Sequence, residues 1–518
     1  MSKEHHQDHA HQHAHGHERA DLAILMKLAA TDNLTALEAV LNEGKTDINQ
    51  KDSQGSTALM YAARYNPNPA SISVLVSAGS DVNAQDRDGL SALALASCHN
   101  SAEIVQALLE SGAEVNLTDS YGQNALMLAL TSGHSDSAKL LINAGADPNA
   151  RSCQGKTALM LTGERALIRR LLQSGADVNA RDENLGTPLL YAVCNEESPE
   201  ALKLLIDNGA GLNAQDRTGA SPLLYASQLS HSYETVKLLI ESGADLNLQD
   251  SHGLTPLIAS FYPEEDNSKV SQLLIKSGAD VNLRTKDGDT ALLLASRDRA
   301  SASTVKLLLE HGADHTAKDR DGDTALMIAV RDARSEEIAR LLLDASAEVD
   351  PRGLSDATPL MHASRQEGSA GLVRVLLERG ADPNASARGG ITALILAATL
   401  YGNEETVRLL IEKGAEVDKE DDAGYTALYS VLASCQDPEL LTLLTGRGAD
   451  VNHRSKAGIT PHMYASSKSK PEIVEALLKL GAKPLLKSPD GKSALDMTKE
   501  NRKHGTEIAS LLMAYSQG

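Results

Sequence analysis

Residues 175–192 read Gly-Ala-Asp-Val-Asn-Ala-Arg-Asp-Glu-Asn-Leu-Gly-Thr-Pro-Leu-Leu-Tyr-Ala, and both halves of this stretch return along most of the chain. The first half runs from one glycine to a second one. The second half begins with a hydroxyl or amide residue that is followed by Ala or Pro and then usually by Leu. Self-similarity at a fixed period of about 20 to 50 residues is the signature of repeat architectures. The stretch therefore predicts a repeated structural unit.

The second half predicts the start of a helix in each unit. Thr and Ser side chains accept hydrogen bonds from free backbone N–H groups, and Pro is tolerated in a first helical turn. Apolar residues then follow at helical spacing, as in residues 324–329, and a later pair such as Leu341-Leu342 predicts a second helix. The pattern occurs fourteen times, beginning at Thr57, Ser91, Asn124, Thr157, Thr187, Ser221, Thr255, Thr290, Thr324, Thr358, Thr392, Thr426, Thr460 and Ser493.

The segment between the second helix and the next motif has a constant length. From its first glycine to the next motif residue is 12 positions, as from Gly79 to Ser91, and Ser346 replaces the glycine once. Glycine there supplies a left-handed end to the helix, and the Asp-x-x-Gly sequence predicts a closing turn. We therefore expect extended turns that stay in register. The unit from Thr157 to Gly175 is three residues shorter than usual, which predicts a local irregularity.

These patterns resemble the ankyrin repeat, over roughly residues 20 to 515. Thr-Pro-Leu-x-x-Ala is kept at residues 187–192, Ser-Pro-Leu at Ser221, and Gly-Ala-Asp-Val-Asn at Gly175, Gly278 and Gly448. The resemblance implies an all-α repeat solenoid of stacked helix-turn-helix units with projecting hairpin loops. The histidine that this family has at the fourth motif position is absent, and residues such as Met60, Met327 and Tyr429 replace it. The inter-repeat hydrogen bonds of that histidine are therefore expected to be lost.

The ends of the chain differ from its middle, as the terminal units of a repeat array must. We expect a disordered histidine-rich tail over residues 1–19 and an ankyrin-repeat solenoid over residues 20–518. Within the solenoid, an N-terminal cap unit covers 20–51, tandem repeats cover 52–487, and a C-terminal cap unit covers 488–518. With neighbouring helices about 10 Å apart, some fifteen units would make a rod on the order of 150 Å long.

Composition argues against several classes of function. Lys and Arg number 49 and Asp and Glu number 70, so the formal charge is −21, which repels phosphate backbones and argues against nucleic-acid binding. No apolar run approaches the roughly 20 residues that span a bilayer, so we expect no membrane insertion. A cytoplasmic location is the default expectation, and secretion by a route without an apolar signal is a second interpretation. The cysteines indicate a reducing compartment because they are scattered, at Cys98, Cys153, Cys194 and Cys435.

Seven histidines crowd the first 17 residues. Imidazoles at alternate positions of a flexible chain can chelate Zn, Ni or Cu, so weak metal binding is expected of this tract. An incidental tail is the other interpretation, and no dedicated cofactor is predicted. The histidines are His5, His6, His9, His11, His13, His15 and His17.

No motif predicts catalysis, so we expect that the protein is not an enzyme. Residues 150–157 fit a permissive phosphate-loop pattern, but Gly155 and Thr157 are the turn glycine and motif threonine of their repeat. Residues 319–323 resemble half of a calcium loop, but Thr324 and Val330 stand where that loop needs Gly and Glu.

Candidate binding residues follow from the resemblance, because partners of this family usually contact the turn tips and the exposed end of the first helix. Arg64, Arg297, Arg331 and Arg365 occupy that helix end, and the last three are 34 residues apart. Arg grips carboxylates in a bidentate manner, which predicts a partner with an acidic segment. Further candidates at the turn tips are the basic residues Lys286, Arg320 and Arg388 and the exposed aromatic residues Tyr121, His252 and Tyr425.

A different interpretation of the arginines is a solvated surface on which neighbouring carboxylates neutralise them, because surface ion pairs are common and weak. The candidates for that neutralisation are Asp287, Asp298, Asp321 and Asp332. Under this interpretation exchange of Arg297, Arg331 and Arg365 for Glu would not change the binding of a partner. Under the first interpretation the exchange weakens binding without lowering thermal stability much.

The sequence therefore predicts a non-enzymatic protein-interaction scaffold. It is expected to act as a monomer and to bind partner proteins on the concave face and the turn tips. The first alternative is metal handling through the histidine tract. The second is an effector-type protein that acts on partners in a host.

Overall fold

The computed structural model describes residues 21–516, except for residues 231, 263–266, 298–300 and 354–355. The chain divides into two compact units, 1–251 and 252–518, and each unit is described by itself. Among the described residues every regular element is a helix, and β-type pairing is limited to isolated bridges such as Gln85 with Ser91. The predicted all-α repeat architecture is confirmed.

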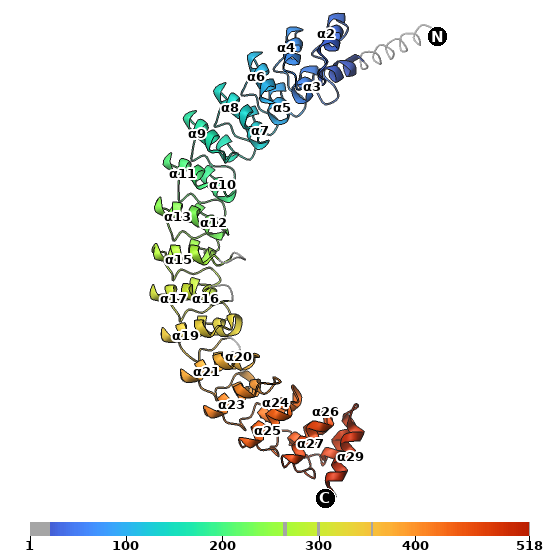
Figure 1. Ribbon diagram of the computed structural model, residues 1–518, viewed down its shortest axis with the longest axis vertical. Coiled ribbons are helices and arrows are strands. Elements are labelled where there is room, and N and C mark those ends of the chain that lie inside the picture. The colour runs from blue at the N-terminus through green and yellow to red at the C-terminus, as the bar shows by residue number, and fades with distance from the viewer. Residues whose placement is uncertain (1–20, 231, 263–266, 298–300, 354–355, 517–518) are drawn as a thin grey trace, which may run out of the picture. The chain divides into compact units, whose positions relative to one another are not determined.

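Unit 1 consists of two rows of helices (Figure 1). First helices, which follow the motif residues, pack on the first helices of neighbouring repeats, and second helices pack on second helices. The first helices are α3 (Ala58–Tyr65), α5 (Ala92–His99), α7 (Ala125–Thr131), η1 (Ala158–Met160), α10 (Pro188–Cys194) and α12 (Pro222–Gln228). The second helices are α2 (Leu34–Glu43), α4 (Ala70–Ser77), α6 (Ala102–Glu110), α8 (Ser135–Asn143), α9 (Arg165–Gln173), α11 (Pro199–Asp207) and α13 (Tyr233–Glu241). Residues 21–29 form the helix that pairs with α2 in the predicted cap region.

Unit 2 repeats the same two-row arrangement. Its first helices are α14 (Pro256–Ala259), α16 (Ala291–Ala295), α18 (Ala325–Ile328), α20 (Pro359–Ser364), α22 (Ala393–Ala397), α24 (Ala427–Ala433), α26 (Pro461–Lys468) and α28 (Ala494–Met497). Its second helices are α15 (Ser268–Lys276), α17 (Ala302–Glu310), α19 (Glu336–Asp344), α21 (Ala370–Glu378), α23 (Glu404–Glu412), α25 (Pro438–Gly446), α27 (Pro471–Lys479) and α29 (Gly505–Ser516). Short irregular helices are the π-helix η2 (Ala329–Ala333), which continues α18, and the 3-10 helices η3 (Arg388–Gly390) and η4 (Thr498–Glu500).

The motif residues cap the first helices as predicted. In most repeats the motif side chain accepts a hydrogen bond from the N–H three residues later, as Thr57 does from Met60. Thr157, Thr324 and Thr426 are exceptions, because their buried hydroxyls have no hydrogen-bond partner. Thr157 begins the shortened repeat, whose first helix is the three-residue η1, so the predicted irregularity is confirmed.

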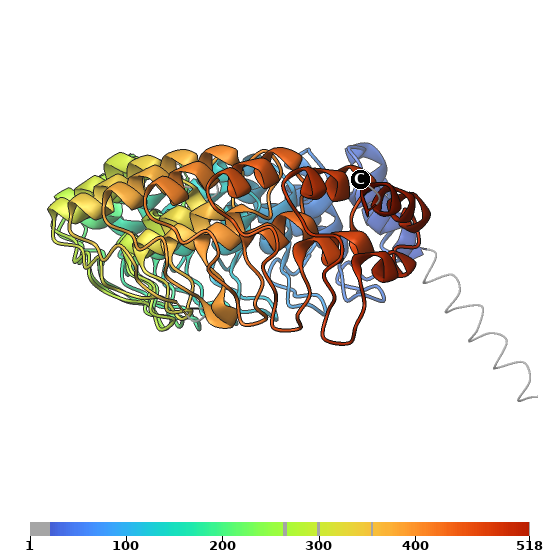
Figure 2. The same cartoon turned by 90° about the horizontal axis from the view of Figure 1, so that it is seen from below.

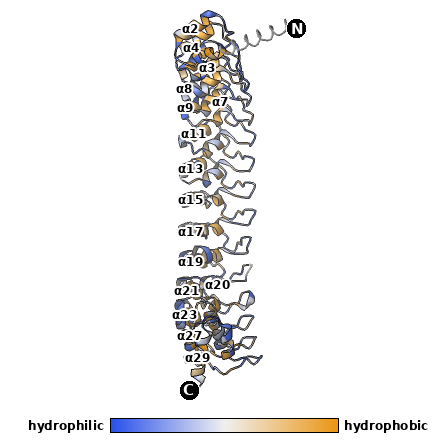
Figure 3. Cartoon of the chain, turned by 90° about the vertical axis from the view of Figure 1, so that its right-hand side faces the viewer, coloured by the Kyte–Doolittle hydropathy of each residue, from blue (hydrophilic) through white to orange (hydrophobic). Residues whose placement is uncertain are grey.

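The core of each repeat lies between its two helices and the helices of the next repeat. Leu59 and Met60 of α3 and Leu108 of α6 are at most 1% exposed. Figure 3 shows that the most hydrophobic residues lie in the helices and not in the projecting turns. At Met60, buried apolar contacts thus stand in place of the hydrogen bonds that the family's histidine forms. At Tyr429, however, the expectation of lost hydrogen bonds is wrong, because its hydroxyl donates to the carbonyl oxygens of His453 (3.0 Å) and Ile459 in the next repeat.

The extended turns project from one side of the helices (Figure 2). Each tip is tied to the next by one backbone hydrogen bond throughout unit 1. The donors are the N–H groups of Arg87, Ser120, Cys153, Glu183, Arg217 and Ser251, and the acceptors are the carbonyls of Gln54, Asp88, Tyr121, Gln154, Asn184 and Thr218. In unit 2 the same bond joins His252 to Lys286, Gly389 to Asp422 and Ala423 to Lys456. Successive turns therefore stay in register, as their fixed length predicted.

The asparagine of the Gly-Ala-Asp-Val-Asn run forms a second link between successive turns. We call this link the asparagine bridge. The asparagine's amide donates to the carbonyl of the glycine that begins the next turn, and it accepts from the N–H two residues after that glycine. This two-way bridge is formed by Asn49, Asn116, Asn149, Asn179, Asn282, Asn384 and Asn452. It explains why an asparagine recurs there.

Because successive turns approach each other closely, replacing a glycine by alanine should cost more stability in a turn tip than at the end of a second helix. Gly424 (φ 78°) and Gly414 (φ 97°) both have left-handed backbones, but a Cβ on Gly424 would lie 2.5 Å from the Lys456 nitrogen, whereas one on Gly414 would meet nothing within 4 Å. We expect Gly414→Ala to cost about 1 kcal/mol and Gly424→Ala about 2 to 3 kcal/mol of unfolding free energy. Chemical denaturation of the two variants measures the difference. Equal losses would contradict this account of the turn.

Candidate protein-interaction surface

The predicted row of arginines lies at the ends of three successive first helices of unit 2. Arg297 lies two residues after the end of α16, Arg331 lies within η2, and Arg365 is the C-terminal cap of α20. Because these helices belong to consecutive repeats, the structure places the three side chains at equivalent positions. Their electrostatic surroundings nevertheless differ.

Arg297 is held loosely by carboxylates of two turns. Its guanidinium lies 3.7 Å from Asp289 of its own repeat and 3.9 Å from Asp319 of the next. Burial raises the pKa of Asp289, and the positive charge of Arg297 offsets only part of that rise. With 44% of its side chain exposed, Arg297 is open to a partner.

Arg331 is held much more firmly. Its guanidinium forms ion pairs with Asp323 and with Asp332, at 2.8 Å for the latter. The hydrogen bonds to Asp332 and the charge of Asp323 raise the pKa of Arg331 above its ordinary value, against the effect of burial. Since the Asp323 side chain is only 7% exposed, Arg331 neutralises a nearly buried carboxylate. Exchange of Arg331 for Glu would place a second carboxylate there, so the ion pair argues for a loss of stability in the triple variant, contrary to the expectation from the sequence.

The partners of these arginines were only partly predictable. Asp332 was one of the predicted carboxylates, but Asp289, Asp319 and Asp323 of the turns were missed. A signal existed in the repeats of unit 1, where Tyr61, Tyr191 and Tyr225 donate to the carboxylate of the turn aspartate nine residues earlier, at 2.6 to 2.9 Å. Turn carboxylates thus take donors from the first helix, but Arg297 and Arg331 pair with Asp289 and Asp323, which directly precede the motif residue and do not stand five residues before it.

Three of the basic candidates in unit 2 form no ion pair within 4 Å with any described residue. Arg365 is exposed on the first-helix row, and Lys286 and Arg320 are exposed on neighbouring turn tips. Arg388 lies on a third tip; its side chain is 75% exposed and its Nε lies 3.5 Å from Asp356. These four residues, together with Arg297, make up what we call the basic strip.

The remaining candidates lie outside the basic strip. In unit 1 the guanidinium of Arg64 lies 5.2 Å above the ring of Tyr65, and Tyr121 is 61% exposed at its tip. In unit 2 His252 is exposed. Tyr425 is not an exposed anchor as predicted, because its half-buried ring packs 4.8 Å from Tyr429 and 6.1 Å from Tyr464.

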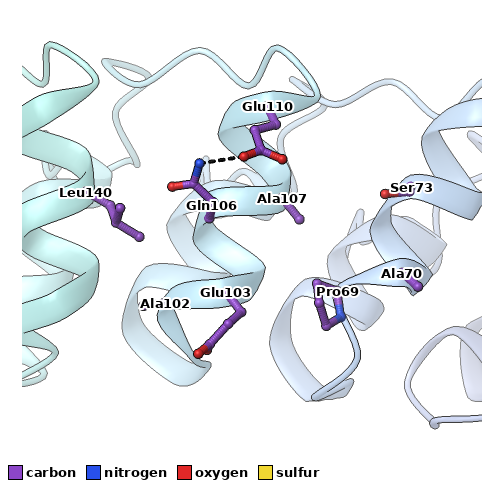
Figure 4. Close-up of a pocket in the computed structure, with 9 residues that line it drawn as sticks. All are labelled: Pro69, Ala70, Ser73, Ala102, Glu103, Gln106, Ala107, Glu110 and Leu140. Carbon is purple, nitrogen blue, oxygen red and sulfur yellow. Dashed lines mark hydrogen bonds between the residues drawn. The ribbon is translucent and has the colours of Figure 1, made fainter.

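The cavities found among the described residues are open grooves. One of about 560 Å³ lies over the second helices α4, α6 and α8 of unit 1 (Figure 4). Small side chains such as Ala70 and Ser73 line it, and Gln106 donates to Glu110 (2.6 Å) across one turn of α6. No histidine or cysteine is among the residues that line this groove.

Within the described residues, no group of three or more His, Cys, Asp or Glu side chains is placed to hold a metal ion. The predicted metal-binding histidines, His5 to His17, lie outside the described residues. None of the described helices combines the length and the apolar character that a bilayer crossing requires.

Comparison with known proteins identifies the family. A family model for ankyrin repeats, three copies long, matches the chain in overlapping segments: 5–86, 25–119, 65–152, 93–182, 157–250, 189–285, 257–353, 305–387 and 360–455. No curated protein matches the chain significantly. The matched segments cover well over half of the sequence, and the helix pairs, left-handed glycines and tied turns agree with them. The chain belongs to the ankyrin-repeat family.

Proposed function

We propose that this protein is a non-enzymatic scaffold that binds an acidic segment of a partner protein on the basic strip of unit 2. Ankyrin repeats generally mediate protein–protein interaction. The observation that carries the more specific proposal is the set of exposed cations on adjacent repeats, of which Lys286, Arg320 and Arg365 have no carboxylate of a described residue within 4 Å.

The chemistry of the strip favours an acidic peptide over other ligands. Guanidinium groups pair with carboxylates through two parallel hydrogen bonds, and unpaired arginines lose no internal partner when they do so. The rest of the chain carries a large excess of negative charge, which lowers its attraction for extended polyanions. Because the helices and tied turns hold the strip in place before binding, little conformational entropy is lost.

Charge reversal tests this proposal. The triple variant Lys286→Glu, Arg320→Glu, Arg365→Glu is expected to bind a fluorescent polyglutamate peptide at least about tenfold more weakly than the unmodified protein. Fluorescence anisotropy at low and at physiological ionic strength measures the affinity.

A matched control separates the strip from the overall charge of the chain. Lys269, Lys276 and Arg408 are exposed residues of second helices in the same unit, without an ion pair to a described residue. Exchanging these three for Glu changes the net charge equally and should leave the affinity within about twofold of the original. Equal weakening by both triple variants, or by neither, would refute binding at the basic strip.

A further inference from the structure

Three junctions in unit 2 lack the asparagine of the bridge, because Thr316, Asp350 and Asp418 stand at its position. Asp350 and Asp418 still accept from the N–H groups of Asp382 and Asp450, so only the junction after Thr316 lacks both hydrogen bonds of the bridge among the described residues. Thr316 stands where Asn282 and Asn384 stand in other repeats, and its hydroxyl donates to Asp314 of its own turn (2.6 Å). None of its hydrogen bonds to described residues reaches the repeat that begins its turn at Ser346. By contrast, Asn384 donates to Gly414 (2.8 Å) and accepts from Glu416 (2.8 Å). We call the two places the 316/346 junction and the 384/414 junction.

Another tie is long at the 316/346 junction. In several repeats the side chain six residues before the motif residue donates to a carbonyl of the next repeat: the distance is 2.7 Å from Lys51 to Gln85 and 2.8 Å from Arg352 to Ser386. From Lys318 to Arg352, across the 316/346 junction, the distance is 3.4 Å. A hydrogen bond of that length is close to the limit at which it still counts as one.

The backbone beside this junction is strained. Ser346 takes the left-handed conformation (φ 68°) that glycine adopts in the other repeats, and Arg334 does the same (φ 50°) at the end of η2. In residues with a Cβ this left-handed conformation costs free energy, because the Cβ crowds the backbone. The π-helix η2 is also less regular than an α-helix. Among the described residues, the turns are therefore joined by fewer hydrogen bonds here than at the 384/414 junction, where Asn384 forms two and the N–H of Asp422 donates to Gly389, and the backbone here carries more strain.

The helices across the junction stay connected. The Nε2 of Gln366, after α20, donates to the carbonyl oxygens of Val330 (3.2 Å) and Arg331 (3.1 Å) in η2. The weak contacts thus lie on the turn side and the firm ones on the helix side. In a repeat array, where each repeat touches only its neighbours, the weakest interface decides where opening begins.

We propose that the 316/346 junction is a hinge of unit 2, at which the turns separate first while the first helices remain packed. The junction lies between the repeats of Arg331 and Arg365, and the turn of Arg320 borders it. Opening therefore changes the spacing of the basic strip, and an acidic partner that spans the strip would hold the hinge closed. This last consequence rests on the proposed function, whereas the hinge itself does not.

Hydrogen–deuterium exchange of the full chain without any partner tests the hinge. Amides in residues 314–323 and 346–353 are expected to exchange at least about tenfold faster than amides in the equivalent residues 382–391 and 414–421. Equal or slower exchange at the 316/346 junction would overturn the proposal. Because no partner is present, this outcome is independent of whether the basic strip binds an acidic peptide.

Two variants test the stated cause. Thr316→Asn with Ser346→Gly copies the pair of the 384/414 junction and should slow exchange at residues 314–323 and 346–353 by about tenfold. Asn384→Thr is the converse change and should accelerate exchange at residues 382–391 and 414–421. If the double variant leaves the fast exchange unchanged, or if Asn384→Thr has no effect at its own junction, the asparagine bridge does not control the hinge and the proposal fails.

Discussion

Replacement of His462 by leucine is expected to raise the free energy of unfolding of the C-terminal repeats by about 2 kcal/mol at pH 7. His462 lies in α26, is 1% exposed, and neither of its ring nitrogens has a hydrogen-bond partner. Burial of a polar group without a partner costs about 1 to 3 kcal/mol. Other repeats have leucine at this motif position, as Leu326 and Leu394 show, so the apolar side chain fits the site.

The same substitution should remove a dependence of stability on pH. Burial lowers the pKa of His462 from 6.5 to about 4 in the folded protein. Because the folded-state pKa is the lower one, the unfolded chain takes up the proton first as pH falls. Stability is therefore complete above pH 6.5 and declines between pH 6.5 and about 4, by up to about 3 kcal/mol.

Urea denaturation between pH 7 and pH 4, followed by the fluorescence of the tyrosines in the last repeats, measures both effects. His462→Leu should be more stable at pH 7 and should lose less stability on acidification than the unmodified protein. If the two proteins show the same stability at pH 7 and the same decline, His462 is not the buried unpaired group described above.

Replacement of Arg331 by methionine is expected to lower the unfolding free energy by about 2 kcal/mol. The nearly buried carboxylate of Asp323 would lose its charged partner, and removing one member of a buried pair is costly. The value lies below the full cost of a buried pair because 35% of the Arg331 side chain is exposed to solvent. Arg365→Met is the matched control; Arg365 has no ion pair with a described residue, so its loss should stay within about 0.5 kcal/mol.

A double-mutant cycle isolates the interaction of this pair. In the protein with Asp323→Asn, the exchange Arg331→Met should cost at least about 1 kcal/mol less than it does beside Asp323. Strict additivity of the two substitutions would mean that Arg331 and Asp323 do not stabilise one another. Arg331 would then be as available to a partner as Arg365 is.

The fold was predictable because the repeat shows the same local signals many times. One Thr-Pro-Leu run is weak evidence, but fourteen motifs at almost constant spacing each repeat the cap, the helix and the left-handed glycine. The three-residue deletion after Thr157 likewise predicted the shortened helix η1. Such features depend on residues close together in sequence, and the pattern therefore reveals them.

The electrostatics of the candidate surface could not be predicted in the same way. Whether Arg331 faces solvent or Asp323 depends on the π-helix η2, which turns the end of the first helix and leaves no mark in the hydrophobic pattern. The packing of Tyr425 depends on Tyr464 in the next repeat. Sequence spacing aligned the three arginines, but only the structure separates the paired Arg331 from the unpaired Arg365.

The most direct test of the proposed function is the position at which an acidic ligand binds. A polyglutamate peptide with a photo-reactive group, irradiated with the full chain and followed by peptide mass spectrometry, reports that position. Crosslinks are expected beside Lys286, Arg320 and Arg365, and the triple charge-reversal variant should lose them. Crosslinks of equal yield on the second helices α15 to α23, or crosslinks that persist in that variant, would contradict binding at the basic strip.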